Sequence, residues 1–388
     1  MFEIVNNRQV IFGENKISEI PGLLKWYGCR KVFFAAYSSS ADSYIRIARA
    51  LTEAGIEHVC YDKVAGEPDL HMINGGRDIF LDQHCDCTLA LGGGSVIDTA
   101  KAIGMLAVNG GNVEDYQMNG KQVTAVPPLF IAVPTTSGTG AEATKTSVVL
   151  NNYNGLKKSL YHTTMIADIV ILDPSLTTGL PAKITAATGM DALSHAIESY
   201  VSLNASPLTE MYGLKAIELI NQSLKDAFPP NGKCQNPGDL EARGNMMLGS
   251  YLGGLAITAG IGIAHIMAQP LGAMYKIPHG DACSIFLPGS MELNLDYAES
   301  RYANVAKALG VSKAGCTDRE NALNAIRRVR EIRREINAPV SLAPYITETP
   351  DMDFIIETVK KTTGHITCNP CPLTEQLMRD AFEKAMAE

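Results

Sequence analysis

Short apolar segments alternate with amphipathic helical segments along the first half of the chain, and this alternation limits the fold more than any other feature. The apolar segments carry β-branched and aromatic residues, as strands do. They are Lys31–Ala36, Glu57–Tyr61 and residues 87–91, 129–133, 145–150 and 166–172. Helical spacing lies between them, over residues 40–54, 72–82 and 95–108. Strands separated by helices of this length form βαβ units, which predicts an α/β class with a mostly parallel sheet and helices on both faces.

The second half has a different pattern, in which strand signals nearly vanish. Five segments have helical spacing: Ala182–Val201, Pro207–Ala227 and residues 240–268, 297–308 and 319–336. The change falls at Leu180-Pro181. We predict two domains, an α/β domain over residues 1–180 and an all-helical domain over residues 181–388.

Charge and hydropathy argue against two classes of partner. Lys and Arg number 33 against 41 Asp and Glu, a formal net charge of −8, whereas a nucleic-acid binder needs clustered cations. Residues 244–275 contain no Asp, Glu, Lys or Arg, but they include His265, Gln269 and several glycines and have no aromatic belt or basic flank. We interpret this stretch as buried helix, and we expect neither nucleic acid nor a membrane as a partner.

The cysteines indicate a reducing compartment. There are nine, an odd number, and the first eight residues are too polar for an export signal, so we expect a cytoplasmic protein. Cys368 and Cys371 have the spacing of a redox or zinc pair, but no second pair of this spacing accompanies them. A redox or metal role for this pair is the less favoured interpretation.

A glycine-rich loop joins one predicted strand to the next helix. Gly92, Gly93, Gly94 and Ser95 follow the strand at 87–91, and Asp98 lies one turn into the helix. Glycines let the backbone approach an anion, which the free amides and the helix dipole stabilise. Ile97 stands where the usual dinucleotide motif has a third glycine, and there is no Walker lysine. The loop predicts a nucleotide pyrophosphate site in a Rossmann-like domain; the alternative is a tight turn with no ligand.

A second loop strengthens the nucleotide hypothesis. Residues 134–142 leave the next predicted strand at its carboxyl end, where ligands of open α/β sheets bind. The hydroxyls of Thr135, Thr136 and Thr139 suit the ribose and phosphate edge of a nucleotide.

Four residues of the helical half have the chemistry of a metal site. Asp191 and His195 are four apart on one predicted helix and therefore share a face. His265 lies on a second apolar helix, and His279 lies in a predicted turn, Ile277-Pro278-His279-Gly280. Three imidazoles and one carboxylate suit iron or zinc better than magnesium or calcium, which prefer oxygen ligands.

Several ordered motifs together resemble the iron-containing (group III) alcohol dehydrogenase family over essentially the whole chain. They are residues 92–101 (GGGSVIDTAK), 134–142 (PTTSGTGAE), 173–181 (DPSLTTGLP), 188–202 (TGMDALSHAIESYVS), 265–280 (HIMAQPLGAMYKIPHG) and Asn369-Pro370. The resemblance implies a nucleotide-binding α/β domain, a helical domain, and a cleft between them for NAD(P) and one divalent metal, Fe2+ or Zn2+. It assigns the metal to Asp191, His195, His265 and His279, and it implies hydride transfer between nicotinamide and an alcohol or aldehyde.

Three departures from the family pattern bear on the substrate. The sequence has Gln269 where a second histidine is usual, Ala256 where an aromatic residue often lines the pocket, and Thr258 where asparagine is common. We expect a roomier and more polar pocket, which includes Cys368, for a small polar or anionic aldehyde or primary alcohol. In the family's pattern a histidine at 269 could pass protons, whereas an amide can only orient a substrate or water.

The segment after the first predicted strand bears on the cofactor. NAD-specific members tend to have an acidic residue there, and this chain has Tyr37, Ser38, Ser39 and Ser40. No carboxylate would repel a 2′-phosphate and no Arg would attract one, so we lean slightly to NADP(H).

Two rival functions remain open on the sequence. Dehydroquinate synthase-like and glycerol-1-phosphate dehydrogenase-like enzymes resemble this architecture, although the runs at 188–202 and 278–280 match alcohol dehydrogenases better. A non-enzymatic nucleotide-binding protein is the second rival. For the enzyme we expect a homo-oligomer that acts on a small molecule.

Overall fold

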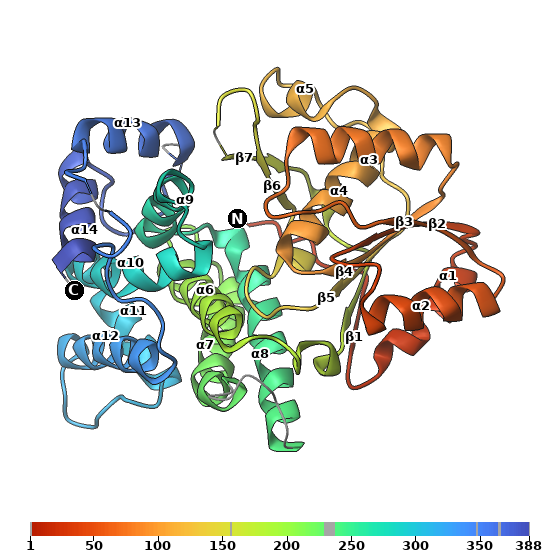
Figure 1. Ribbon diagram of the computed structural model, residues 1–388. Coiled ribbons are helices and arrows are strands. Elements are labelled where there is room, and N and C mark those ends of the chain that lie inside the picture. The colour runs from red at the N-terminus through yellow and green to blue at the C-terminus, as the bar shows by residue number, and fades with distance from the viewer. Residues whose placement is uncertain (1, 156, 229–236, 347, 364–365, 388) are drawn as a thin grey trace. The chain divides into compact units, whose positions relative to one another are not determined.

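The computed structural model describes residues 2–155, 157–228, 237–346, 348–363 and 366–387 (Figure 1). They form two compact units. One, here called the sheet unit, contains Glu3–Thr136 and Ala141–Thr177; the other, the helical unit, contains Thr178–Glu388, Ser137–Gly140 and the first two residues. The predicted boundary at residue 180 stays a prediction, and each unit is described by itself.

The sheet unit is built on a parallel six-stranded sheet. Its strand order is β1-β8-β5-β4-β2-β3. The strands are β1 (Gln9–Phe12), β2 (Lys31–Ala36), β3 (Glu57–Tyr61), β4 (Cys87–Gly92), β5 (Phe130–Pro134) and β8 (Ile169–Leu172). The order places β2 and β4 side by side with their carboxyl ends at one edge, where ligands of open α/β sheets bind.

Helices cover both faces of this sheet (Figure 1). Val32, Phe34 and Ala36 of β2 pack in one core cluster with the helices α1 (Ile20–Trp26) and α2 (Asp42–Glu53). Phe33 points to the opposite face, where its ring lies 5.8 Å from that of Phe80 in α3 (Leu70–Asp82). The helix α4 (Gly94–Asn109) lies on the same side as α3. Alternate residues of a buried strand thus contact helices on both sides, and the predicted α/β architecture is confirmed.

Two parts of the sheet unit differ from the predicted strands. Residues 145–150 do not join the main sheet, because β6 (Thr146–Leu150) pairs antiparallel with β7 (Lys157–Tyr161). The sequence analysis did not predict β7, β1 or the short α5 (Val113–Gln117). Strand β1 has only four residues, three of them exposed, and its apolar run of three is too short to indicate a strand.

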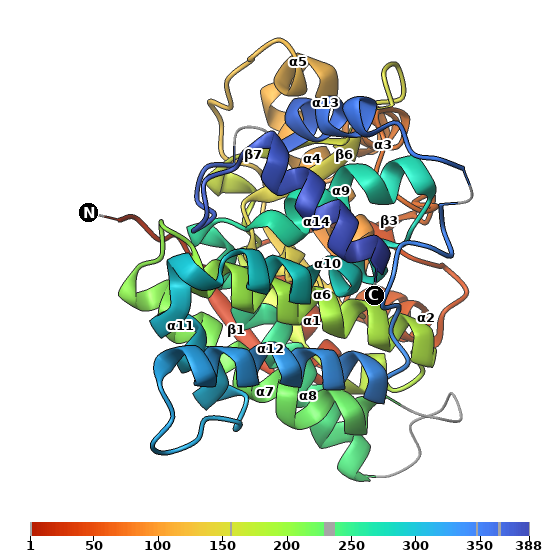
Figure 2. The same ribbon diagram turned by 90° about the vertical axis from the view of Figure 1, so that its left-hand side faces the viewer.

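The helical unit contains no strand within its described residues. Its helices pack around one large core cluster, and Figure 2 shows α7 and α8 side by side and α11 beside α12. They are α6 (Ala182–Val201), α7 (Pro207–Ala227), α8 (Pro237–Ala256), α9 (Ile263–Tyr275), α10 (His279–Leu293), α11 (Leu295–Ala308), α12 (Asp318–Glu335), α13 (Met352–Thr363) and α14 (Glu375–Ala387). The prediction of an all-helical second half is confirmed.

The single helix predicted over 240–268 is wrong. It is divided into α8, a short 3-10 turn (Ile257–Ala259) and α9. Gly260 ends the turn with a φ of 89°, a left-handed conformation that interrupts a helix, and a Cβ there would lie 2.4 Å from the Cys368 sulfur. No single described helix is long and apolar enough to span a membrane; one pair, Asp239–Ala259 with Ile263–Tyr275, meets that test by length and composition but is bent by 104°.

Two prolines lie inside helices of this unit, and the carbonyls that they leave without an N–H donor have side-chain partners. Pro270 in α9 cannot donate to the Ile266 carbonyl, to which the Thr363 hydroxyl donates at 3.4 Å. Pro288 in α10 cannot donate to the Ser284 carbonyl, to which the Arg333 guanidinium donates at 3.1 Å. These contacts let both helices continue past their prolines.

Candidate metal centre and nucleotide-binding loops

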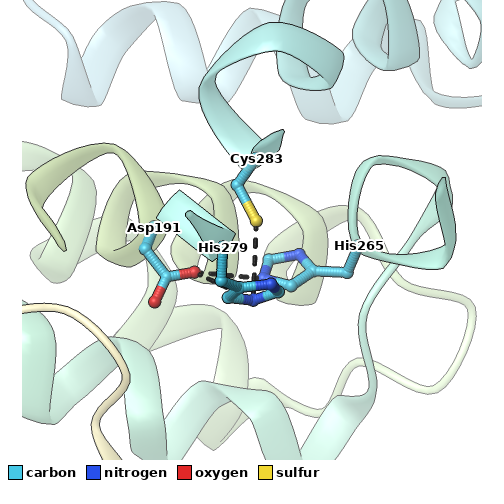
Figure 3. A group of neighbouring side chains, drawn as sticks. All are labelled: Asp191, His265, His279 and Cys283. Carbon is cyan, nitrogen blue, oxygen red and sulfur yellow. Dashed lines mark hydrogen bonds and ion pairs between the residues drawn. The ribbon is translucent and has the colours of Figure 1, made fainter. Parts of the chain in front are cut away.

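Three helices of the helical unit bring the predicted metal ligands together. Asp191 and His195 lie on α6, His265 lies on α9, and His279 is the first residue of α10. The Asp191 Oδ1 atom lies 3.4 Å from His265 Nε2, 3.5 Å from His279 Nε2 and 3.8 Å from His195 Nε2. Figure 3 shows Asp191, His265 and His279 converging on one point.

The start of α10 explains how His279 reaches this group. The predicted turn at residues 277–280 is wrong in one respect, since Pro278 is the N-cap of α10 and His279 already belongs to the helix. Gly280 lies against the backbone of α6, where a Cβ would come 2.0 Å from the Ala187 carbonyl oxygen. Any other residue there would push α10 away from α6, and with it His279 away from Asp191.

The buried polar atoms of the group fit a cation. Asp191 is 3% exposed and His265 is 2% exposed. Asp191 Oδ1 and His265 Nε2 have no hydrogen-bond partner among the described residues. Buried polar atoms are normally paired, and one carboxylate with several imidazoles is a donor set that first-row divalent metals prefer. The residues present therefore fit the iron or zinc ion that the sequence implies.

Burial and charge set the protonation of these groups. Burial opposes ionisation of Asp191, but the neighbouring histidines, His195 foremost, outweigh it and hold the pKa of that carboxyl well below its usual range. Burial lowers the pKa of His195 to about 4, and Asp191 offsets this only in part. His195 is therefore neutral near pH 7 and has a free lone pair, as a metal ligand requires.

The sequence analysis missed Glu198, which holds His265 in place. Glu198 Oε2 lies 2.5 Å from His265 Nδ1, and Oε1 accepts a hydrogen bond of 2.7 Å from the Ala264 N–H. One buried carboxylate thus orients the imidazole and caps the first turn of its helix. Glu198 follows Asp191 and His195 on α6 at the spacing i, i+4, i+7, a signal that could have revealed it.

The sequence analysis also missed Cys283, four residues after His279 on α10. Its sulfur lies 3.6 Å from His279 Nε2. One donor atom from each of Asp191, His265, His279 and Cys283 lies within 4.8 Å of the other three (Figure 3). Burial raises the pKa of the Cys283 thiol to about 12, against the opposing effect of His265.

The two predicted nucleotide loops meet within the sheet unit. The Thr135 N–H donates to the Gly92 carbonyl at 3.0 Å, and a Cβ on Gly93 would lie 3.2 Å from the Thr136 hydroxyl oxygen. Gly93 is the N-cap of α4, which begins at Gly94 and Ser95 at the carboxyl end of β4. The residues of this helix start, Gly93 to Ser95, are half-buried, and the free backbone amides of a helix start suit an anion.

Two other predicted cofactor residues lie differently. The Asp98 carboxylate is buried, accepts from the Val148 N–H at 3.0 Å and lies 3.6 Å from the Lys101 ammonium. Its described partners therefore belong to the interior of the sheet unit. Thr139 belongs to Ser137–Gly140, the segment assigned to the helical unit. The cofactor contacts of both residues stay predictions.

A carboxylate does lie beside the segment that the sequence analysis found free of acids. Tyr37 and Ser38 follow β2, and the Ser39 hydroxyl donates to the carboxylate of Asp62, which follows the neighbouring strand β3. This hydrogen bond lowers the pKa of Asp62, which is therefore ionised at neutral pH. The segment after β2 has no carboxylate of its own, but Asp62, which follows β3, places one beside Ser39, and the lean toward NADP(H) stays a prediction.

The predicted pocket residues lie near the start of α9 or on it. Ala256 is fully buried at the end of α8, and Thr258 is exposed in the following 3-10 turn. Gln269 is half-buried one turn after His265 on α9. Cys368 is buried with its sulfur 3.2 Å from the Ile261 carbonyl oxygen, and both Cys368 and Cys371 are free thiols. Their role in a pocket stays a prediction.

The chain thus joins an α/β unit with a glycine-rich loop to a helical unit with a candidate metal centre. The model of the family "Iron-containing alcohol dehydrogenase" matches residues 7–174, and that of "Fe-containing alcohol dehydrogenase family, C-terminal" matches residues 185–386. The chain belongs to the iron-containing alcohol dehydrogenase family and is an oxidoreductase acting on CH–OH groups.

Individual relatives agree with this assignment. The chain is 33% identical over 349 residues, 89% of its length and 90% of the relative's, to an NAD-dependent methanol dehydrogenase of Bacillus methanolicus. It is 32% identical over 390 residues, 99% of both chains, to a 1,3-propanediol dehydrogenase of Citrobacter freundii. A crystal structure of 1,3-propanediol oxidoreductase covers all of both chains with a TM-score of 0.93 at 31% identity.

Proposed function

We propose that this protein interconverts small polar alcohols and aldehydes with NAD(H), using one divalent metal ion held by Asp191, His195, His265 and His279. The observation that carries the proposal is the position of Asp191 Oδ1, buried and within 3.4 to 3.8 Å of three imidazole nitrogens. The family name suggests iron, and the same nitrogen and oxygen donors also bind zinc.

The residues of the centre have separate tasks in this mechanism. When bound, the divalent ion supplies a Lewis acid for the substrate oxygen, and the nicotinamide supplies the hydride acceptor or donor. Asp191 contributes the negative charge that favours a cation, and neutral His195 contributes a lone pair. Glu198 fixes the ring of His265 so that Nε2 faces Asp191.

Gln269 supports a polar substrate. It lies one turn beyond His265 on α9 and is half-buried, so its amide can donate a hydrogen bond near the metal ligands. An amide has no accessible pKa and cannot relay a proton, so proton exchange must use water or the hydroxyls of the cofactor ribose. A polar group on the substrate is the partner that this donor would select. Both 1,3-propanediol and methanol, named for relatives, are small alcohols.

The cofactor preference follows from Asp62. A 2′-phosphate on the adenosine ribose would bring a double negative charge toward the carboxylate of Asp62 beside Ser39, whereas the ribose hydroxyls of NAD could donate hydrogen bonds to that carboxylate. We therefore favour NAD(H) over the NADP(H) that the sequence alone suggested. An NAD-dependent relative supports the same preference.

Cellular context belongs to the proposal as well. We propose a cytoplasmic homo-oligomer, as the cysteine content and the family resemblance indicate. Fractionation of cells and light scattering of the purified protein test these two points.

The direct test of the function is a substrate matrix. Metal-free protein is reconstituted with Fe2+ or Zn2+ and assayed with NADH and NADPH against short aliphatic aldehydes and against aldehydes bearing hydroxyl, carboxylate or sulfonate groups. We expect metal-dependent oxidation of NADH with a preference for the polar aldehydes. Turnover without metal would contradict the assigned chemistry, and equal rates for polar and apolar aldehydes of one size would contradict the substrate class.

A further inference from the structure

Among the described residues that are not already among the four predicted ligands, the thiol of Cys283 is the side chain best placed to bind a metal ion. It extends from the second turn of α10 toward the same point as Asp191, His265 and His279 (Figure 3). Asp191 and His265 are both more than nine-tenths buried, and Asp191 Oδ1 and His265 Nε2 have no hydrogen-bond partner among the described residues. A buried thiol beside such atoms lies where a metal ligand would be.

We propose that Cys283 is a ligand of the metal ion, so that the centre includes a sulfur donor in addition to its histidines and carboxylate. The proposal rests on the proposed function only in assuming that a divalent metal binds at this site. It adds a residue that neither the sequence motifs nor the four predicted ligands include.

Three distances among these residues agree with coordination of one ion. Bonds of about 2.0–2.2 Å to nitrogen and oxygen and about 2.3 Å to sulfur, at near-tetrahedral angles, keep N and O donors about 3.4 Å apart and N and S donors about 3.6 Å apart. His195 Nε2, 3.8 Å from Asp191 Oδ1, remains a further ligand of the same ion. Asp191 Oδ1 lies 3.4 Å from His265 Nε2 and 3.5 Å from His279 Nε2. Cys283 Sγ lies 3.6 Å from His279 Nε2. These three pairs already have the spacing that a shared ion would require, and all four donor atoms lie within 4.8 Å of one another.

Sulfur coordination has chemical consequences. The thiol proton is released to solvent as the S–metal bond forms, so that no oxidant or reductant is needed. The thiolate adds a second negative charge to that of Asp191, and it is a soft donor that favours zinc or cobalt(II) over iron(II). The site should therefore bind zinc more tightly, relative to iron, than a site with histidine and carboxylate donors alone.

Cobalt(II) is the probe that tests this proposal. A Co2+–thiolate bond gives an intense near-ultraviolet charge-transfer band, whereas nitrogen and oxygen donors give only the weaker visible d–d bands. We expect the metal-free protein to acquire both on addition of one equivalent of Co2+. Cys283→Ser and Cys283→Ala should lose the charge-transfer band and keep the d–d bands, with affinity for zinc lower by roughly tenfold or more.

A second cysteine group provides the control. Cys29, Asp86 and Cys87 of the sheet unit also have donor atoms within 4.8 Å of one another. Cys29→Ser should leave the charge-transfer band unchanged, and loss of the band in this variant instead would overturn the assignment to Cys283.

A measurement on the unaltered protein guards against a variant that fails to fold. X-ray absorption of the zinc-loaded wild type should contain one sulfur scatterer at about 2.3 Å. A zinc or cobalt centre with only nitrogen and oxygen neighbours would overturn the proposal and leave the proposed function intact. Failure of the wild type to bind any divalent metal would contradict the proposed function instead.

Discussion

The carboxylate of Glu198 connects two features of the metal centre, since it bonds the imidazole of His265 through Oε2 at 2.5 Å and the Ala264 N–H through Oε1 at 2.7 Å. The ligand that α9 contributes is therefore fixed in orientation from α6, the helix that carries Asp191 and His195. The metal centre depends on a residue that is not itself one of its predicted ligands.

Glu198→Gln should weaken metal binding without unfolding the protein. The amide oxygen can accept one of the two hydrogen bonds, so either the ring of His265 or the first turn of α9 loses its partner. We expect metal affinity to fall by roughly ten- to a hundredfold, with activity largely recovered in excess metal. Competition with a chromophoric chelator measures this affinity. Glu210→Gln, which removes a half-exposed partner of Arg301, is the control and should bind metal as the wild type does; unchanged affinity in Glu198→Gln would rule out the positioning role.

The glycine loop should determine cofactor affinity. In Gly93→Ala the new Cβ lies 3.2 Å from the Thr136 hydroxyl oxygen, at the amides that would receive the pyrophosphate. We expect KM for the cofactor to rise roughly tenfold or more with a smaller change in kcat. Gly75→Ala on α3 meets no atom within 4 Å and should change neither. If the two variants have the same cofactor KM, the loop is only a turn.

Asp62 should discriminate between the two nicotinamide cofactors. Asp62→Asn removes the charge beside Ser39 and should lower the ratio of kcat/KM for NADH to that for NADPH by roughly tenfold, about the effect of one nearby charge. Asp42→Asn, an exposed aspartate at the start of α2, is the matched control. A wild type that prefers NADPH would show that Asp62 does not face the ribose.

Glu142 should make stability depend on pH. Burial raises the pKa of this carboxyl to about 7 from its ordinary 4.5, against the opposing effects of its own backbone N–H and of Lys101. The folded protein therefore binds the proton more tightly than the unfolded chain, and this contribution to stability is lost as pH rises from about 4.5 to about 7. At most the loss amounts to about 3 kcal/mol.

Urea unfolding at about pH 5 and about pH 8 measures this effect. Relative to the wild type, Glu142→Gln should gain stability at the higher pH. Glu53→Gln, an exposed position of the same unit, should follow the wild type at both. A Glu142→Gln variant with an unchanged pH dependence would show that the carboxyl is ionised throughout this range.

The predictable parts of the fold are those with long or repeated patterns. Lys31–Ala36, Ala182–Val201 and Pro207–Ala227 have the observed bounds, because each is an apolar or amphipathic segment limited by Gly, Pro or Ser. The edge strand β1 and the break at Gly260 could not be predicted. Strand β1 depends on pairing with β8, and the break depends on the packing of Gly260 against Cys368. Both are contacts between residues that are far apart in the chain.

The site was predictable where residue type is diagnostic. A histidine on an apolar helix indicated His265, and a histidine in a predicted turn indicated His279, although nothing in their spacing joins them to Asp191. Glu198 lies seven residues after Asp191, and Cys283 lies four residues after His279. Such helical spacings are common in any sequence. Only the folded structure shows that Glu198 contacts His265 and that Cys283 contacts His279. The carboxylate of Asp62 was missed because strand β3 lies beside β2 in the sheet and not in the sequence.

Asp191 and its three histidines are proposed to hold the metal on which catalysis depends, and the decisive experiment measures metal content together with activity. Wild type and Asp191→Asn are freed of metal, reloaded with Fe2+ or Zn2+, passed through a desalting column, and assayed for metal per chain and for NADH formed from a small polar alcohol. We expect one ion per chain and metal-dependent NADH formation in the wild type. We expect loss of both in a folded Asp191→Asn, because a site without its carboxylate should bind at least roughly ten- to a hundredfold more weakly. An Asp191→Asn protein that keeps one ion per chain and full activity would show that these residues do not hold a catalytic metal.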